Sequence, residues 1–130
     1  MREILFRGKR TDNGQWKYGL LTKLCGESCI FSEENEIDVK AVFLETVQQY
    51  TGMTDINGKK IFEGDVVCCT GTWEFPFLGV VQYSGASCAF YVETKEPLNA
   101  EWSTYLLGNQ ITVEVKGNIY DNPELMEDKQ

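Results

Sequence analysis

The stretch QYTGMTDINGKKIFEGDVV, from Gln49 to Val67, decides the fold of this chain. Alternating residues predict a strand that ends at about Thr51. Asp55–Gly58 has the composition of a turn, and its glycine suits a left-handed backbone. A second strand is predicted over Ile61–Cys69, with a bulge or sharp bend at Gly64-Asp65. We interpret the glycines and aspartates of this stretch as the structural joint between two β lobes: Gly52, Asp55, Gly58, Gly64 and Asp65.

On the N-terminal side, short apolar and alternating segments predict further strands. The apolar run Glu3–Arg7 and the alternating run Trp16–Leu20 flank turn residues at Asp12–Gly14. This pattern predicts a β-hairpin, with a long basic tip at Gly8–Arg10. The alternation over Ile37–Ala41 predicts another strand, which follows an acidic loop.

On the C-terminal side, Leu78–Tyr83 and Ser87–Glu93 have the composition of two connected strands. Clean alternation over Ile111–Val115 predicts a further strand. The segment Leu98–Tyr105 is the least regular, and we expect a short helix there. Asn followed by proline at the start of Pro123–Met126 predicts a final helical turn.

These elements predict a mainly β fold. The sequences Gly64-Asp65-x-Val67, Gly79-Val80-Val81 and Phe90-Tyr91-Val92 resemble the strands of SH3-like barrels, a likeness of fold alone. We therefore expect an N-terminal β lobe, residues 1–51, packed on a C-terminal SH3-like small barrel lobe, residues 52–130, with one or two short helical turns. A single compact domain over residues 1–127 is the alternative.

Composition limits the class of protein. With 130 residues, 42% hydrophobic and 25% charged, the chain is expected to fold as one or two small lobes. The N-terminus has no apolar signal core, and no run is long enough for a membrane span. Five cysteines without secretory features indicate reduced thiols. We expect a cytoplasmic protein.

Charge is unevenly distributed along the chain. Residues 1–23 carry six basic and two acidic residues, a net charge of +4, whereas residues 24–130 carry a net charge of −12. The overall balance of −8 argues against broad binding to a phosphate backbone, so nucleic acid is an unlikely partner. Two narrower hypotheses stay open: a local nucleic-acid site at the basic end, and an acidic decoy that mimics nucleic acid.

Three segments together resemble a known family. MREILFRGK at the start, QYTGMTDINGKKIFEGDVV in the middle and VEVKGNIYDNPELM near the end are similar to the YopX-like family of phage and prophage proteins, in the order found in that family. The resemblance spans nearly the whole chain. It implies a small, mainly β, uncharacterised phage or prophage protein in the bacterial cytoplasm, and it implies no reaction.

Catalytic and metal chemistry receive little support from the sequence. Histidine is absent, which removes the commonest general base and metal ligand. Glu63 and Asp65 would share a face of a regular strand, but the expected bend at Gly64 separates them, and a backbone bond from Asp65 is the preferred interpretation. We therefore predict no enzyme activity, no catalytic residue, no cofactor and no metal ion.

The cysteines do not have the usual zinc spacing. Cys25 and Cys29 are separated by three residues, and the adjacent Cys68 and Cys69 would face opposite sides of a strand. Cys88 is expected to be a small buried hydrophobic residue. The acidic loop Glu33–Asp38 lacks the calcium-loop pattern and is expected to be solvated.

Two surfaces are candidates for binding. Four basic residues, interleaved with Trp16 and Tyr18, form the candidate nucleic-acid patch: Arg7, Lys9, Arg10 and Lys17. The preferred alternative places the two aromatic residues on the core face and leaves the cations solvated or paired with acids. Aromatic residues around Pro76 form a candidate partner surface: Trp73, Phe75 and Phe77. The leading hypothesis is a non-enzymatic accessory protein that contacts an unknown protein partner or self-associates as a homo-oligomer.

Overall fold

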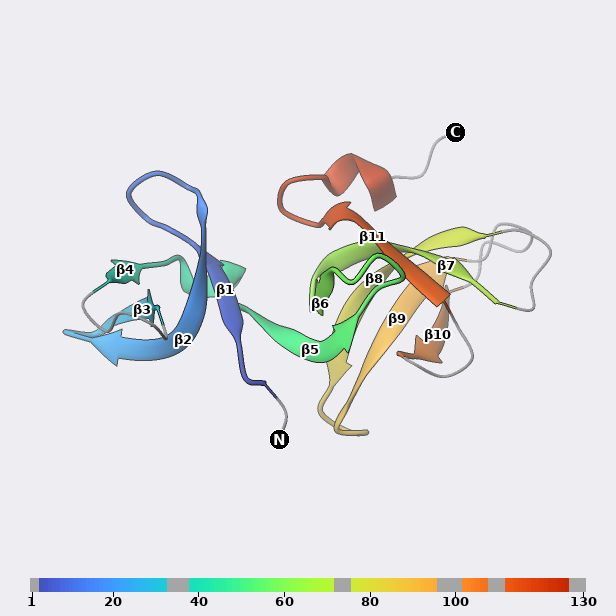
Figure 1. Cartoon of the computed structure of the whole chain (residues 1–130), viewed down its shortest axis with the longest axis horizontal. Helices are drawn as coiled ribbons and strands as arrows, with labels where there is room; N and C mark the ends of the chain where they lie inside the picture. Colours follow the sequence, from blue (N-terminus) through green and yellow to red (C-terminus); the bar gives the residue numbers. More distant parts are fainter. Residues whose placement is uncertain (1–2, 33–37, 72–75, 96–101, 108–111, 127–130) are drawn as a thin grey trace. The chain divides into compact units, whose positions relative to one another are not determined.

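The structure, a computed structural model of the chain, describes residues 3–32, 38–71, 76–95, 102–107 and 112–126 (Figure 1). Contacts divide the chain into two compact units, Met1–Gly52 and Met53–Gln130. The described residues form eleven β-strands, paired antiparallel, and two short 3-10 helices. The mainly β prediction is therefore confirmed, and so is the expectation of one or two short helical turns. The packing of one lobe on the other stays a prediction.

The first unit is a curled antiparallel sheet. Its strand order is β4-β3-β2-β1-β5, and β5 runs on towards β6 of the second unit. The elements are β1 (Phe6–Lys9), β2 (Trp16–Leu24), β3 (Glu27–Phe31), β4 (Val39–Ala41), the 3-10 helix η1 (Leu44–Thr46) and β5 (Gln48–Thr54). The curvature of β2 is visible in Figure 1.

The curled sheet returns to β1 just beyond β4. Val42 forms an antiparallel bridge with Arg10, and the N–H of Phe43 donates to the carbonyl of Lys9 at 2.9 Å. The curled sheet and this return contact enclose a small core around Ile30 and Val42, both of which are buried. A Cβ at Gly8 would lie 3.1 Å from Val42 and 3.2 Å from Ile30, so the missing side chain allows this close approach.

The second unit is built on a five-stranded sheet with the order β10-β9-β8-β7-β11. Four strands follow one another as a meander, and the last returns to pair with the first. The SH3-like barrel stays a prediction. The elements are β6 (Lys60–Phe62), β7 (Asp65–Thr70), β8 (Phe77–Ser84), β9 (Ala89–Lys95), β10 (Trp102–Leu106), β11 (Thr112–Asn118) and the 3-10 helix η2 (Pro123–Met126).

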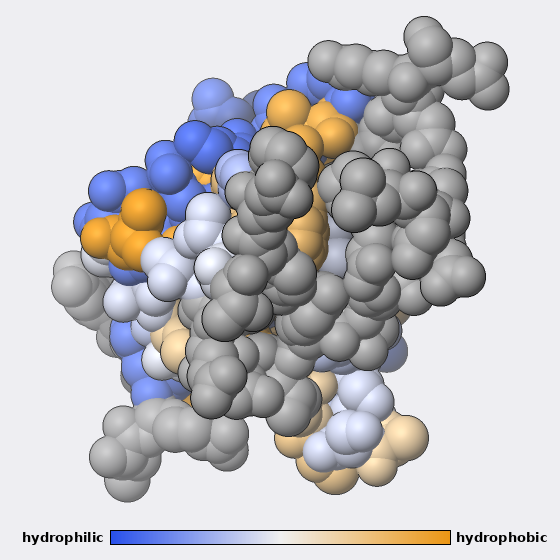
Figure 2. All heavy atoms as spheres, turned by 90° about the vertical axis from the view of Figure 1, so that its right-hand side faces the viewer, coloured by the Kyte–Doolittle hydropathy of each residue, from blue (hydrophilic) through white to orange (hydrophobic). Residues whose placement is uncertain are grey.

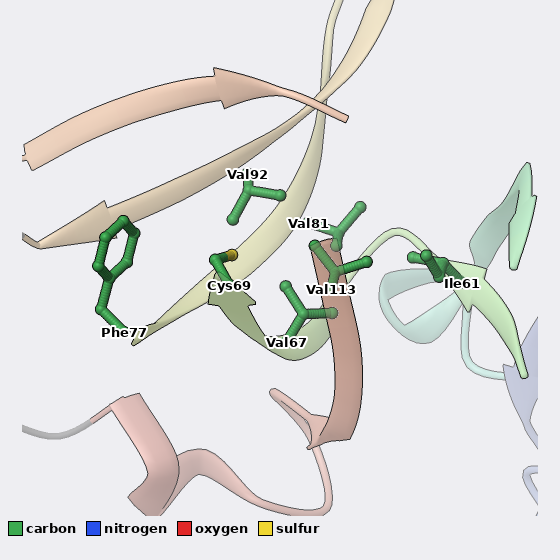
Figure 3. Close-up of a cluster of buried hydrophobic side chains, with 7 residues drawn as sticks. All are labelled: Ile61, Val67, Cys69, Phe77, Val81, Val92 and Val113. Carbon is green, nitrogen blue, oxygen red and sulfur yellow. The ribbon is translucent and has the colours of Figure 1, made fainter. Parts of the chain in front are cut away.

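The core of the second unit is formed mainly by β-branched residues. Valine side chains from β7, β8, β9 and β11 converge beside Cys69, with Phe77 at one end and Ile61 at the other (Figure 3). Alternation places every second residue of each strand on this face. Several of these residues have no exposed surface, which makes the cluster the main hydrophobic support of the unit: Ile61, Val67, Cys69, Val81 and Val92.

Two local predictions are wrong. The described part of the segment expected to be helical belongs to β10 (Trp102–Leu106), which pairs with β9 from Trp102↔Lys95 to Leu106↔Tyr91, whereas residues 98–101 lie outside the described residues. The hairpin tip does not begin at Gly8, because Gly8 and Lys9 extend the β1–β2 ladder to Lys9↔Trp16. The turn follows Arg10, whose N–H donates to the Gln15 carbonyl at 2.9 Å.

Within the described ranges, no helix is long and apolar enough to cross a membrane. On the face drawn in Figure 2, hydrophobic side chains of described residues form separate patches among hydrophilic ones. On this face the surface colouring alone does not single out one binding site.

Candidate functional site

The N-terminal basic residues surround Trp16. In the β1–β2 ladder Lys9 lies directly opposite Trp16, and Arg7 lies one diagonal step away, opposite Tyr18. The Arg7 guanidinium carbon is 4.7 Å from the Trp16 ring centroid, and Lys9 Nζ is 5.2 Å from it. Both distances are within cation–π range. The Trp16 ring therefore makes cation–π contacts with two basic residues of its own sheet, Arg7 and Lys9.

Three basic residues of the candidate patch have hydrogen-bond or ion-pair partners within the first unit. Arg7 is only 5% exposed, and its Nε donates to Oε1 of Gln48 on β5 at 2.7 Å. Arg10 forms a two-bond ion pair with Asp12, at 2.9 and 2.7 Å. Lys17 Nζ lies 2.5 Å from an oxygen of Asp38. The structure therefore brings each of these three cations to an internal partner.

The ion pairs lower the pKa of their carboxyl groups. The hydrogen bond from Arg10 holds the pKa of Asp12 below its usual value, and the bond from Lys17 does the same for Asp38. The nearby charge of Lys40 favours ionisation of both carboxylates. These residues form a charge-compensated cluster, which offers less net positive field to a polyanion than the sequence alone indicates.

Tyr18 does not belong to the core face that the preferred sequence interpretation gave it. Its side chain is 48% exposed, opposite the buried Arg7, so this part of the interpretation is wrong. The other part, pairing of cations with acids, is confirmed at Arg10 and Lys17.

A rigid turn presents two apolar side chains on the first unit. Phe43 is 44% exposed and Leu44 is 63% exposed, at the start of η1. Their backbone is fixed, because Thr46 Oγ1 donates to the Phe43 carbonyl at 2.6 Å and accepts from the Lys9 N–H at 2.8 Å. In the sequence, Val42-Phe43-Leu44 is an apolar run that favours a strand, so the pattern gives no sign of this exposed pair.

In the second unit, the predicted joint residues build two turns. Gly58 has φ +81° and Gly64 has φ +85°, as expected for left-handed positions. Asp65 is buried and accepts a hydrogen bond from the Phe62 N–H at 2.8 Å, which is the local backbone bond predicted for it. The Gly64 N–H donates to the Val81 carbonyl at 2.7 Å, so the bend is bound to β8.

The carboxylate of Asp55 accepts hydrogen bonds from three backbone N–H groups. One carboxylate oxygen accepts the N–H groups of Asn57 at 2.9 Å and Lys59 at 2.8 Å, and the other accepts that of Val115 at 2.9 Å. Burial opposes ionisation, but these bonds and the Lys59 charge together hold the pKa of Asp55 below its usual value. The role supported by these contacts is structural.

The candidate aromatic surface is only partly described. Trp73 and Phe75 lie outside the described residues. Phe77 is buried in the core cluster of the second unit, against the other side chains drawn in Figure 3. Its side chain is therefore unavailable to a partner surface, because strand β8 begins at Phe77 and directs it inward.

The cysteines are free thiols in different settings. Cys25 and Cys88 are exposed, Cys29 and Cys69 are buried, and Cys68 is intermediate. The expectation that Cys88 is buried is wrong, because Cys88 lies in the turn before β9, with φ +52°. Desolvation raises the pKa of the Cys69 thiol to about 11. Among the described residues, no three Cys, Asp or Glu side chains gather as metal ligands.

Comparison with known proteins agrees with the fold. The structure is similar to the crystal structure of protein EF1440 from Enterococcus faecalis, with a TM-score of 0.54 and 21% sequence identity. The similarity covers 98% of this chain and 100% of that one. No curated protein matches the sequence. The family model described as YopX protein matches residues 3–127, which is nearly the whole chain. The chain therefore belongs to the YopX family.

Proposed function

We propose that this YopX family member is a non-enzymatic phage or prophage accessory protein of the bacterial cytoplasm, and that it acts by protein–protein contact or self-association. The family resemblance of its three sequence segments supports the phage or prophage setting. The observation that carries the contact hypothesis is the exposed Phe43–Leu44 pair on its hydrogen-bonded turn.

The Phe43–Leu44 pair has two properties of a contact surface. Its two apolar side chains are adjacent and strongly exposed, and exposed apolar groups of this kind favour burial against a partner. Its backbone is already ordered by Thr46 and Lys9, so association would cost little further backbone entropy. Anchors in protein interfaces combine these properties.

The nucleic-acid hypothesis has weaker support. Arg7 is buried against Gln48, while Arg10 and Lys17 lie in ion pairs. A strand of nucleic acid would have to compete with these internal partners. The acidic-decoy hypothesis requires carboxylates spaced along one face. Several carboxylates are instead engaged inside their own unit, either buried or beside a cation: Asp12, Asp38, Asp55, Asp65 and Glu114.

The proposal is tested by the mass and the partners of the purified chain. Light scattering gives its oligomeric state, and affinity capture from the bacterium that carries the gene gives its partners. We expect a dimer or a defined complex that weakens at least about tenfold in Phe43→Ser/Leu44→Ser, as expected for loss of an apolar anchor.

Leu24→Ser is the matched control, because Leu24 is also in the first unit and is 49% exposed. It should leave the association unchanged. A monomeric chain without a partner would overturn the proposal, and so would a complex that is insensitive to Phe43 and Leu44.

A further inference from the structure

β11 is the last strand in the order of the second sheet, with β7 on one side. In an antiparallel ladder, the backbone groups of successive residues point alternately to the two sides. The outward-pointing groups include the carbonyl of Val113 and the N–H of Val115. An unoccupied edge of this kind would be a template for pairing with another strand.

The turn Asp55–Lys59 occupies this edge. The Ile56 N–H donates to the Val113 carbonyl at 3.2 Å, and the Val115 N–H donates to Asp55 Oδ2 at 2.9 Å. A backbone donor and a carboxylate thus take the two positions that a neighbouring strand would use. Figure 1 shows the chain between β5 and β6 passing beside β11.

The turn is held in shape independently of β11. The Asp55 N–H donates to the Lys59 carbonyl at 2.8 Å, and the Gly58 N–H donates to the Asp55 carbonyl at 3.0 Å. Asp55 Oδ1 accepts two further N–H groups from the turn. One carboxylate therefore closes the turn with one oxygen and docks it on the strand with the other.

The sequence of β11 is suited to pairing with a second copy of itself. In an antiparallel pair centred on Val115, the outward groups of the two valines exchange both hydrogen bonds. The same register brings Glu114 towards Lys116 of the other copy, twice, at the residue where the β11–β7 ladder shifts its register. These side chains already form an ion pair at 3.0 Å within one strand. Opposite charges in facing positions stabilise a strand pair.

We propose that the turn Asp55–Lys59 is an edge guard, which keeps β11 from pairing with the β11 strand of a second copy of this chain. The inference does not depend on the Phe43–Leu44 surface. It assigns to Asp55 a function beyond stability, because removal of its carboxylate exposes the Val115 N–H to a competing strand.

The test compares Asp55→Ala with the wild-type chain by light scattering over a range of concentrations. We expect self-association above the wild-type level, rising with concentration. Lys116→Glu added to Asp55→Ala should abolish this increase, because it brings glutamates of the two copies close to one another. Phe43→Ser added to Asp55→Ala should leave the increase in place, which separates this result from that of the proposed function.

Asp38→Ala is the control for loss of a carboxylate, because Asp38 pairs with Lys17 in the first unit. It should not increase association. A folded Asp55→Ala variant that associates no more than the wild type would overturn the proposal. An increase that Lys116→Glu does not reduce would also overturn it.

If Asp55→Ala does not fold, hydrogen exchange of the wild-type chain tests the edge-guard proposal instead. A guard that occupies the outer edge of β11 requires the Val115 amide, which bonds Asp55, to be protected from exchange. Exchange of Val115 as fast as an unprotected amide would contradict the inference.

Discussion

The carboxylate of Asp55 accepts a hydrogen bond of 2.9 Å from the backbone N–H of Val115, sixty residues further along the chain. This bond joins the Asp55–Lys59 turn, within the stretch that decides the fold, to β11, the last strand of the chain's described part. The Gln49–Val67 stretch is therefore more than a sequence of local turns. Its Asp55 fixes one edge of the sheet in the second unit.

Asp55→Asn should lower the free energy of unfolding by about 1–3 kcal/mol at neutral pH, because the amide replaces a buried, charged acceptor that bonds three backbone N–H groups. Urea denaturation measures the loss. Asp12→Asn is the control, since Asp12 is exposed and its ion pair is expected to contribute little. Equal effects of the two substitutions would contradict the assignment.

The same carboxylate should make stability depend on pH. The pKa of Asp55 is lower in the folded chain than in the unfolded one, where a value of about 3.9 applies. Its stabilisation is thus fully present above about pH 4 to 5 and is lost as the pH falls through the folded-state pKa. Denaturation curves at decreasing pH should show a decline in the wild type that is smaller in Asp55→Asn. Parallel declines would contradict the prediction.

Gly19→Ala should be one of the more damaging single substitutions in the first unit. Gly19 has φ +156°, and a Cβ built there would overlap the carbonyl oxygen of Phe31. Because that oxygen belongs to the backbone of β3, it cannot move without disturbing the ladder. We expect a loss of about 2–4 kcal/mol by chemical denaturation. Gly85→Ala is the control, with no atom within 4 Å of the added carbon, and should be nearly neutral.

Arg7→Lys should destabilise the first unit, although the charge is retained. The guanidinium both covers the Trp16 ring and bonds Gln48, and an ammonium group does not reproduce that planar geometry. A loss of about 1–2 kcal/mol is expected, together with a change in the emission of the tryptophans. Lys23→Arg, at an exposed position of β2, is the control.

Oligonucleotide binding tests the other role considered for the basic residues of the first unit. If the basic patch were a nucleic-acid site, the wild-type chain would bind an oligonucleotide with an affinity that falls steeply between about 50 and about 200 mM salt. Arg7→Ala and Arg10→Ala would weaken that binding. We expect no such salt-dependent binding in a fluorescence anisotropy titration. Its presence would favour the nucleic-acid hypothesis over protein contact.

The thiols should react in two groups. Cys25 and Cys88 are exposed and should be alkylated rapidly in the native chain, whereas the buried Cys29 and Cys69 should react only after unfolding. The pKa of Cys69, about 11, leaves almost no thiolate at neutral pH. Mass spectrometry of the alkylated chain, with and without denaturant, measures the pattern. Rapid native labelling of Cys69 would contradict its place in the core.

Local backbone chemistry was predictable from the sequence, and long-range pairing was not. The conformations of Gly58 and Gly64 and the bond made by Asp65 depend on a few neighbouring residues, so composition indicated them. The strand at Trp102–Leu106 depends on its pairing with β9, which no local pattern encodes. The local pattern alone therefore favours a short helix over Leu98–Tyr105.

The candidate site shows the same division. The basic residues could be counted in the sequence, but the positions of their partners are set by the folded sheet: Gln48 begins β5, and Asp38 lies directly before β4. Phe43 and Leu44 follow a buried valine, so their exposure becomes apparent only once η1 turns the chain outward. Trp73 and Phe75 lie beyond the described part of the chain, so the partner surface predicted there stays a prediction.

Site-specific photo-crosslinking in the bacterial host tests the contact hypothesis most directly. A photoreactive phenylalanine analogue replaces Leu44 in one variant and the control residue Leu24 in another, because both are exposed on the first unit. We expect a discrete crosslinked adduct from position 44, either with a second copy of the chain or with one host or phage protein, and none from position 24. Absence of an adduct at position 44, or equal adducts from both positions, would contradict a function carried by the Phe43–Leu44 surface.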